Sequence, residues 1–408
     1  MARVLKELLL IILMLSFINV FVPKGHAAQT QSLTDGNTAF ALELFGQIKS
    51  TPGNVFFSPY SISTCLAMVY AGAHGDTEEQ LARVLHFQGN QAQIHSSFAG
   101  LQNQLNEASK QNRIELKIAN ALWTQKGYPF LPAFLEIAKG EYQANVNQAD
   151  FNTDGERARI EINQWVAEST KDKIQDLLPP GSLHSLTRMI VANAIYFKGL
   201  WTKPFDKAKT SNQPFYLPSG DQVAIPLMHH FDNVRYTENG EFQAVELSYK
   251  SDELSMVGLL PREKDGCAKL ESRLTPALLS QALSQMKQQR VEIFLPRFKL
   301  ESNLNLNDTL VRMGMTDAFG SKADFSAMDG SRLLYISGVF HKAWGEVNEE
   351  GTEAAAATAV AVAGRAISQP PPPPPIFRAD HPFIFFIRDI RSGSLLFLGR
   401  FATPTHNH

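Results

Sequence analysis

The sequence predicts an α+β fold, because helical patterns dominate its first half and strand patterns dominate its second half. Apolar residues at helical spacing lie before residue 170, whereas apolar runs with strand periodicity are concentrated after residue 189. The regular alternation of strand and helix that is typical of a parallel βαβ sheet is absent. Length alone allows two or three domains, but no linker forces a split of the 408 residues, and the pattern indicates a large sheet.

Four segments carry the helical patterns of the first half. Residues 40–48 place apolar side chains at helical spacing after the polar residues 34–37. A serine and a proline at 58–59 open a second helix, because proline is tolerated in the first turn. Residues 75–80 join a cap to acidic side chains, which suits a helix start, and residues 156–169 predict a later helix.

The strand patterns are of two kinds. Residues 189–196 are a continuous apolar run, which predicts a strand buried on both faces. Period-two alternation marks 212–260, and a short turn between 383–390 and 395–401 predicts a hairpin. Further strands are expected at 114–123 and 291–295.

The N-terminus has the pattern of a secretory signal peptide. Arg3 and Lys6 precede an apolar run over 8–22, and small residues follow near Ala27. The apolar run is shorter than the roughly 20 residues that a membrane span needs, and it is interrupted. We therefore predict cleavage near Ala27, with residues 1–27 removed and residues 28–408 secreted to the extracellular space, or to the periplasm if the source is a Gram-negative bacterium.

Composition and charge exclude several classes of partner. The formal net charge is −2, which offers no general attraction to nucleic acid or to a membrane surface. Residues 91–117 hold three basic side chains, too few to predict a polyanion site. Cys65 and Cys267 lie in dissimilar contexts far apart, so we expect them to stay free.

A search for catalytic motifs gives no reason to propose an enzyme, a cofactor or a metal site. The nucleophile elbow, the zinc-protease helix motif and the nucleotide-binding glycine motifs are absent. His229 and His230 lack ligands at metal spacing, and His341 lies in an apolar context that favours a buried structural histidine.

Residues 346–365 have a composition that is unusual for a compact domain. Four consecutive alanines favour helix, whereas valines alternating with alanine favour strand. From Ala354 to Gly364 the side chains are small, without proline or charge. A strand that slides into an existing sheet needs these properties, but a flexible low-complexity surface loop has them too. The residues alone leave both readings open.

Several long motifs, in order, resemble those of the serpin family over residues 35–402. The segment EEGTEAAAAT (349–358) is similar to the hinge of the reactive loop in inhibitory serpins. The other motifs are NVFFSPYSI (54–62), NAIYFKGLW (193–201), DHPFIFFI (380–387) and FLGRF (397–401). The resemblance implies one domain of about nine helices and three β-sheets, with an exposed reactive loop at about 350–379.

The resemblance also implies a suicide mechanism. A target protease attacks the loop and forms an acyl-enzyme, and the loop then inserts into the main sheet and distorts the protease. In the family the attacked bond follows the fourteenth residue after the hinge glycine. Counted from Gly351, that bond is Arg365–Ala366, and arginine there suits trypsin-like serine proteases. We expect the inhibitor to act as a monomer.

The resemblance assigns further roles residue by residue. The hinge would consist of Glu349, Glu350, Gly351, Thr352, Ala354, Ala356 and Thr358. Ser58, Ser61, Asn193 and His341 match the shutter, where polar groups beneath the sheet control its opening. Trp201, Arg297 and Glu349 match the breach, where the loop first inserts. Simple satisfaction of buried polar groups is a compatible interpretation of all these residues.

One segment departs from the common family pattern. Residues 367–379 are long and contain six consecutive prolines at 370–375, which favour a stiff polyproline II rod. Two other functions remain open at this point: a serpin that does not inhibit, and an unrelated secreted enzyme or binding module. Neither accounts as well for a hinge that lacks bulky, charged and proline residues between 354 and 364.

Overall fold

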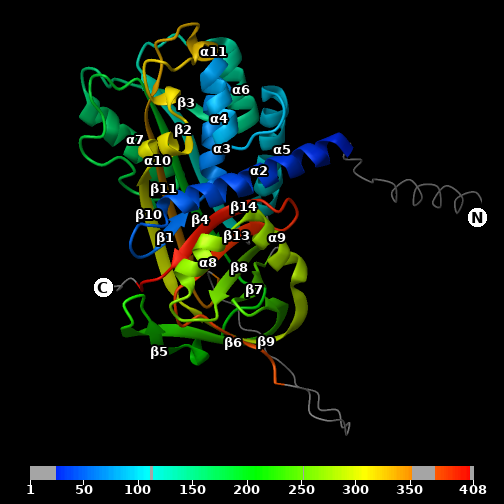
Figure 1. Ribbon diagram of the computed structural model, residues 1–408. Helices are drawn as coiled ribbons and strands as arrows, with labels where there is room; N and C mark the ends of the chain where they lie inside the picture. The colour runs from blue at the N-terminus through cyan, green and yellow to red at the C-terminus, as the bar shows by residue number, and fades with distance from the viewer. Residues whose placement is uncertain (1–23, 111–113, 251, 352–372, 405–408) are drawn as a thin grey trace, which may run out of the picture.

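Figure 1 shows the computed structural model, which describes residues 24–110, 114–250, 252–351 and 373–404. The helices are α2 (Lys24–Ile48), α3 (Pro59–Tyr70), α4 (Gly75–Val84), α5 (Gln91–Lys110), α6 (Pro132–Tyr142), α7 (Gly155–Ser169), α8 (Cys267–Arg273), α9 (Pro276–Gln285), α10 (Asn307–Met313) and α11 (Ser326–Asp329). The strands are β1 (Val55–Phe57), β2 (Ile114–Gln125), β3 (Asn145–Ala149), β4 (Met189–Gly199), β5 (Ser211–Tyr216), β6 (Gln222–Glu238), β7 (Phe242–Ser248), β8 (Leu254–Pro261), β9 (Lys287–Pro296), β10 (Phe298–Asn305), β11 (Ile336–Val347), β12 (Ile376–Arg378), β13 (Phe383–Asp389) and β14 (Leu395–Phe401).

Five strands form a central sheet in the order β10-β11-β4-β2-β3. The expected strand at 189–196 is the middle one, β4, and ten of its eleven residues are buried. Its side chains alternate between two apolar clusters, with Val191 and Ile195 in the main core and Ile190 and Ala192 in a second core beneath α7. The sheet is therefore covered on both faces, as a continuous apolar strand predicts.

The remaining strands form a nine-stranded sheet in the order β1-β14-β13-β8-β7-β6-β9-β12, with β5 paired to β6. The resemblance implied three sheets, whereas the described strands form two. The reason is the length of β6, which pairs with β5 near its start, with β9 along its middle and with β7 only over its last residues. One long strand thus joins two groups of strands into a continuous sheet (Figure 1). The hairpin expected at 383–401 is the antiparallel pair β13–β14.

The first helix is longer than the sequence indicated. The helical pattern in the sequence begins after the polar residues 34–37, but α2 runs without interruption from Lys24 to Ile48. Gly36 lies inside this helix, where its backbone approaches the His86 carbonyl closely. A Cβ atom at this position would come within 2.5 Å of that carbonyl oxygen. The glycine therefore allows close packing of α2 against the end of α4 and does not form a turn. The helix also includes residue 27, where cleavage was predicted.

The helices pack mainly on one face of the central sheet. Every residue of α3 is buried, and this helix contacts β2, β4 and β14. The single helix α7 lies on the opposite face, beside β2 (Figure 1). In the part of the chain described, no helix is both long enough and apolar enough to span a bilayer.

Candidate functional site at the end of strand β11

Two parallel strands, β4 and β11, lie side by side in the central sheet. Their register pairs Met189 with Ile336 at one end and Phe197 with Gly345 at the other. We call this junction of β4 and β11 the seam. The chain leaves β11 at Val347, and the described residues 348–351 form a turn at that end of the seam.

Backbone and indole hydrogen bonds hold this turn, the hinge turn, in place. The Trp201 ring nitrogen donates to the Asn348 carbonyl at 2.9 Å, and the Trp201 backbone N–H donates to the Glu350 carbonyl at 3.1 Å. The backbone N–H of Phe205 donates to the Glu349 carbonyl at 2.7 Å. The indole itself is fixed by stacking on Tyr249, with ring centroids 4.6 Å apart. The segment that follows β4 thus holds the hinge turn through hydrogen bonds.

Gly351 ends the described part of the hinge turn in a conformation that favours glycine. Its φ is +75°, which costs energy for residues with a side chain. A Cβ atom at this position would come within 2.2 Å of the Trp201 nitrogen and 2.4 Å of the Gly199 oxygen. Because both are backbone atoms, neither can yield without movement of the chain after β4.

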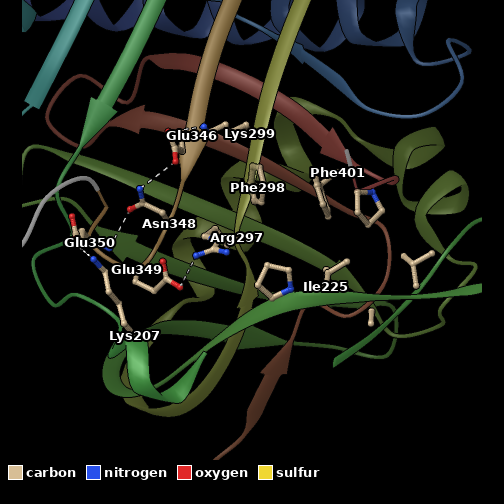
Figure 2. A pocket seen from close by; sticks show the side chains of 14 residues that line it. Lys207, Ile225, Arg297, Phe298, Lys299, Glu346, Asn348, Glu349, Glu350 and Phe401 are labelled. Carbon is tan, nitrogen blue, oxygen red and sulfur yellow. Dashed lines mark hydrogen bonds and ion pairs between the residues drawn. The ribbon is translucent and has the colours of Figure 1, made fainter. Parts of the chain in front are cut away.

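Two acidic side chains of the hinge turn face basic partners. Glu349 is 4% exposed, and its carboxylate lies 3.6 Å from the Arg297 guanidinium. Glu350 forms an ion pair with Lys207, and this contact raises the pKa of Lys207. Figure 2 shows these pairs beside a cavity of about 510 Å³. The cavity leaves open space next to the point where the chain turns back.

A buried polar network lies beneath the middle of the seam. His341 and Asn193 are paired residues of β11 and β4, and their side chains are hydrogen-bonded to each other. The Asn193 amide nitrogen donates to the Ser61 hydroxyl at 2.6 Å and also contacts Asn120 of β2. The Ser58 backbone N–H donates to His341 Nε2 at 3.1 Å. The four residues predicted for the shutter are therefore brought together, and Asn120 joins them.

The hydrogen bonds of His341 define its protonation state. Burial lowers the pKa of His341 to about 3, so the ring is neutral at physiological pH. Because Nε2 accepts from Ser58, the proton lies on Nδ1 and is donated to the Asn193 carbonyl oxygen. The Asn193 amide group is then free to donate towards Ser61 and Asn120.

The serine that begins α3 anchors this network to the nine-stranded sheet. The Ser58 hydroxyl accepts from the Ser61 backbone N–H at 3.1 Å, which caps the helix. The same hydroxyl donates to the Leu396 carbonyl of β14 at 2.6 Å. The network thus connects both strands of the seam to the helix and sheet behind them.

Several predicted residues lie outside the described part of the chain. These are Thr352, Ala354, Ala356 and Thr358 of the hinge and the bond between Arg365 and Ala366. The described chain resumes at residue 373, where β12 pairs in parallel with β9 and the Glu292 N–H donates to the Pro375 carbonyl at 3.0 Å.

Sequence reasoning missed three residues of the site. Asn120 interrupts an apolar run of β2 and could have been found as a polar residue in a buried strand. Asn348 accepts the Trp201 bond through its carbonyl, and Lys207 pairs with Glu350, and neither contact has a local signal in the sequence. Cys65 and Cys267 are both buried and lie unpaired in the structure. Among the described residues, no group of three or more metal-ligand side chains is positioned to hold an ion.

Comparison with known proteins decides the family. The profile of the serpin family, described as serine protease inhibitors, matches residues 35–404. The chain belongs to the serpin family. Human serpin B3 is 42% identical over 393 residues, which cover 91% of this chain and all of that protein. Human leukocyte elastase inhibitor is also 42% identical, over 385 residues that cover 92% of this chain and all of that protein.

Solved structures of serpin-like proteins show the same fold. Uncleaved ovalbumin superposes with a TM-score of 0.83 at 32% identity and covers 91% of this chain and 100% of its own. Arabidopsis AtSerpin1 in its native stressed conformation gives a TM-score of 0.82 at 29% identity, with 92% and 99% covered. The α+β architecture expected from the sequence is therefore confirmed as the serpin fold.

Proposed function

We propose that this serpin is a secreted suicide inhibitor of trypsin-like serine proteases. The observation that carries the proposal is the hinge turn, which lies at the end of a seam between two parallel strands, β4 and β11. A chain that leaves β11 and reverses runs antiparallel to both β11 and β4. Its insertion would replace one parallel ladder with two antiparallel ladders, which are slightly more stable per residue.

The composition of the loop suits this insertion. The seam is covered on both faces by packed cores, so only small, uncharged side chains on the inserted strand fit between the layers. Thr352, Ala354, Ala356 and Thr358 share one face at two-residue spacing. The absence of proline from 354 to 364 leaves every backbone N–H able to join the ladders.

The chemistry at the loop is that of an ordinary protease substrate until the acyl-enzyme ester would be hydrolysed. The protease serine hydroxyl attacks the Arg365 carbonyl carbon, the Arg365–Ala366 bond breaks, and the Ala366 amine leaves with a proton. An ester now joins the protease to Arg365. Insertion then moves the protease along the seam and distorts its active site before water can hydrolyse that ester.

Specificity for trypsin-like proteases rests on Arg365. It lies fourteen residues after Gly351, so its basic side chain would bind in the specificity pocket of the protease. The relatives named leukocyte elastase inhibitor favour a second candidate, inhibition of elastase. Val362 and Ala363 precede Gly364, and Ala366 follows Arg365, so elastase could cleave at a small residue nearby.

The N-terminal pattern supports export. Two basic residues, an apolar run and small residues up to Ala27 have the order of a cleaved signal. We propose that the inhibitor acts outside the cytoplasm as a monomer. Expression of the full chain in a secreting host, followed by N-terminal sequencing of the medium fraction, tests this; retention of residues 1–27 in the cell fraction contradicts it.

One experiment separates the candidate functions. Wild-type protein and Arg365→Ala are each mixed with trypsin and with elastase and run on a denaturing gel. We expect a covalent complex of wild-type protein with trypsin, lost in Arg365→Ala, and a released peptide that begins at Ala366 by mass spectrometry. A stable complex with elastase alone supports the second candidate, and cleavage without any complex contradicts inhibition.

A further inference from the structure

The far end of the seam carries two side-chain hydrogen bonds that link its two strands. Tyr335, directly before β11, donates from its hydroxyl to the Leu186 carbonyl at 2.7 Å. The Arg188 backbone N–H, directly before β4, donates to the Ser337 hydroxyl at 2.9 Å. Both bonds therefore join the beginning of β11 to the segment that leads into β4.

A local irregularity explains the second bond. The register of β11 against β4 shifts between Ile336 and Gly338, so Ser337 lies at a bulge. At this position the Ser337 hydroxyl takes the place of a backbone acceptor for Arg188. The Ser337 carbonyl in turn accepts from the Asn307 side chain at 3.1 Å, which fixes the bulge from the other side.

The reactive loop is long enough to reach these bonds when it inserts as a strand. Gly351 lies against Gly199, the last residue of β4. A strand that runs back from this point brings residue 361 opposite Met189, because residue 361 lies ten residues after Gly351 and Met189 lies ten residues before Gly199. Residues 362–365 then remain before the scissile bond, and they must pass the stretch from Arg188 to Ser185.

Insertion at this point is incompatible with both bonds. Neighbouring strands lie about 4.8 Å apart, so a new strand between β4 and β11 about doubles their separation. A hydrogen bond needs a donor–acceptor distance of roughly 2.7–3.2 Å. Neither the serine hydroxyl nor the tyrosine ring can span the added distance while the backbones separate.

We propose that Tyr335 and Ser337 form a distal latch, consisting of these two bonds, which opens last and limits the speed of the final stage of loop insertion. The proposal rests on the proposed function, because the latch has a role only if the loop inserts. Tyr335 and Ser337 act as positioning residues: they hold the far end of the seam closed in the uncleaved protein and touch neither the protease nor the scissile bond.

The test measures the final movement of the protease directly. The acceptor dye is placed on a new cysteine, His184→Cys, whose residue is exposed and lies two positions before Leu186. Cys65 and Cys267 are buried, and burial raises the pKa of each thiol to about 12, so they do not compete for the label. Donor-labelled trypsin is mixed in a stopped-flow instrument, and energy transfer reports arrival at the far end.

Tyr335→Phe and Ser337→Ala each remove one bond of the latch and keep the rest of the residue. Loss of one hydrogen bond from the closed state is expected to speed the final phase roughly two- to tenfold. Tyr236→Phe is the matched control, because its hydroxyl donates to Glu238 at 2.6 Å within β6 of the nine-stranded sheet, away from the seam. This control should give the wild-type rate.

The outcomes separate this proposal from the proposed function. A faster final phase in both variants, with an unchanged control, supports the latch. Wild-type arrival rates in Tyr335→Phe and Ser337→Ala, accompanied by lower melting temperatures, show that the two bonds are merely structural and overturn it. Absence of a covalent complex with the unmodified protein overturns the proposed function instead.

Discussion

The hinge turn and the shutter lie along the same seam but are stabilised by opposite means. Besides its backbone and indole hydrogen bonds, the hinge turn has two charged pairs at a cavity of about 510 Å³, where water can solvate a group that leaves its partner. The shutter is neutral and buried, and its hydrogen bonds run from His341 through Asn193 to Ser61. A broken bond in the shutter leaves an unpaired buried polar group, which costs about 1–3 kcal/mol.

This difference indicates the order of events. The ion pairs of the hinge turn can break at lower cost than the shutter bonds because their basic partners are exposed, with 51% of the Arg297 side chain accessible. The shutter can open only when an arriving strand replaces the bonds that it breaks. Insertion should therefore begin at the hinge turn and cross the shutter as a cooperative step. The predictions below test the two regions separately.

The largest expected effect comes from a charge in the hinge. Thr352→Arg would have to desolvate a guanidinium between the two covered faces of the sheet, which costs about 3–5 kcal/mol. Insertion should slow by about two to four orders of magnitude, so that the acyl-enzyme hydrolyses first. The stoichiometry of trypsin inhibition on a gel should change from a trapped complex to cleaved product, and Ala356→Pro should behave alike.

Thr352→Val is the control, because it keeps the shape without a charge and should still trap trypsin. Cleavage of the wild-type loop should also raise the melting temperature strongly, since the new strand completes the sheet. An undiminished complex with Thr352→Arg, or an unchanged melting temperature after cleavage, would show that this chain does not act by loop insertion.

The second prediction concerns the backbone of the hinge turn. Gly351→Ala places a Cβ within 2.4 Å of two backbone atoms and forces an unfavourable φ. We expect the hinge turn to detach from Trp201 and the free energy of unfolding to fall by about 2–4 kcal/mol. Gly220→Ala is matched, because Gly220 has a φ of +90° and open space around it, and it should cost about 1 kcal/mol. Equal losses for both variants would contradict the role of the close approach.

The sequence was informative where a structural element leaves a local pattern of residues. The run at 189–196 and the hairpin at 383–401 were predicted correctly because burial on both faces and a short turn leave local patterns. The small-residue segment after Gly351 pointed to an inserting strand only once several motifs agreed. Periodicity alone left a flexible loop equally possible.

The parts that were missed depend on contacts between distant residues. The continuity of α2 through Gly36 follows from a carbonyl 50 residues later, at His86. The joining of two groups of strands follows from three different partners of β6. The pairing of Lys207 with Glu350 joins residues separated by seven of the fourteen described strands. No local pattern encodes such contacts.

The third prediction breaks the shutter with acid. The folded protein holds His341 neutral down to a pKa of about 3, whereas an unfolded chain protonates its histidines near pH 6.5. The unfolded state therefore binds an extra proton between these values, and stability falls as the pH is lowered from about 6.5 towards 3. The slope from this residue is about 1.4 kcal/mol per pH unit.

Denaturant titrations between pH 7 and pH 4 measure this slope. His341→Gln should be less stable at pH 7 but should lose less stability on acidification than the wild type. Burial also lowers the pKa of His95 to about 4, so His95→Gln provides the contribution of a second buried histidine whose pKa is lowered. A wild-type slope in His341→Gln would show that the shutter does not sense pH.

The smallest effect is expected on the far side of the scissile bond. Six prolines at 370–375 favour a rod of about 19 Å, and its end is fixed where Pro375 bonds to β9 and β12 begins. This side does not insert, because cleavage after Arg365 separates it from the hinge. Deletion of the six prolines should therefore lower the association rate with trypsin a few-fold and leave the stoichiometry unchanged. Replacement by six glycine and serine residues keeps the length and removes the stiffness, so a normal rate in that variant would assign the effect to reach alone. Equal changes in rate and stoichiometry would mean that the rod also influences the fate of the acyl-enzyme.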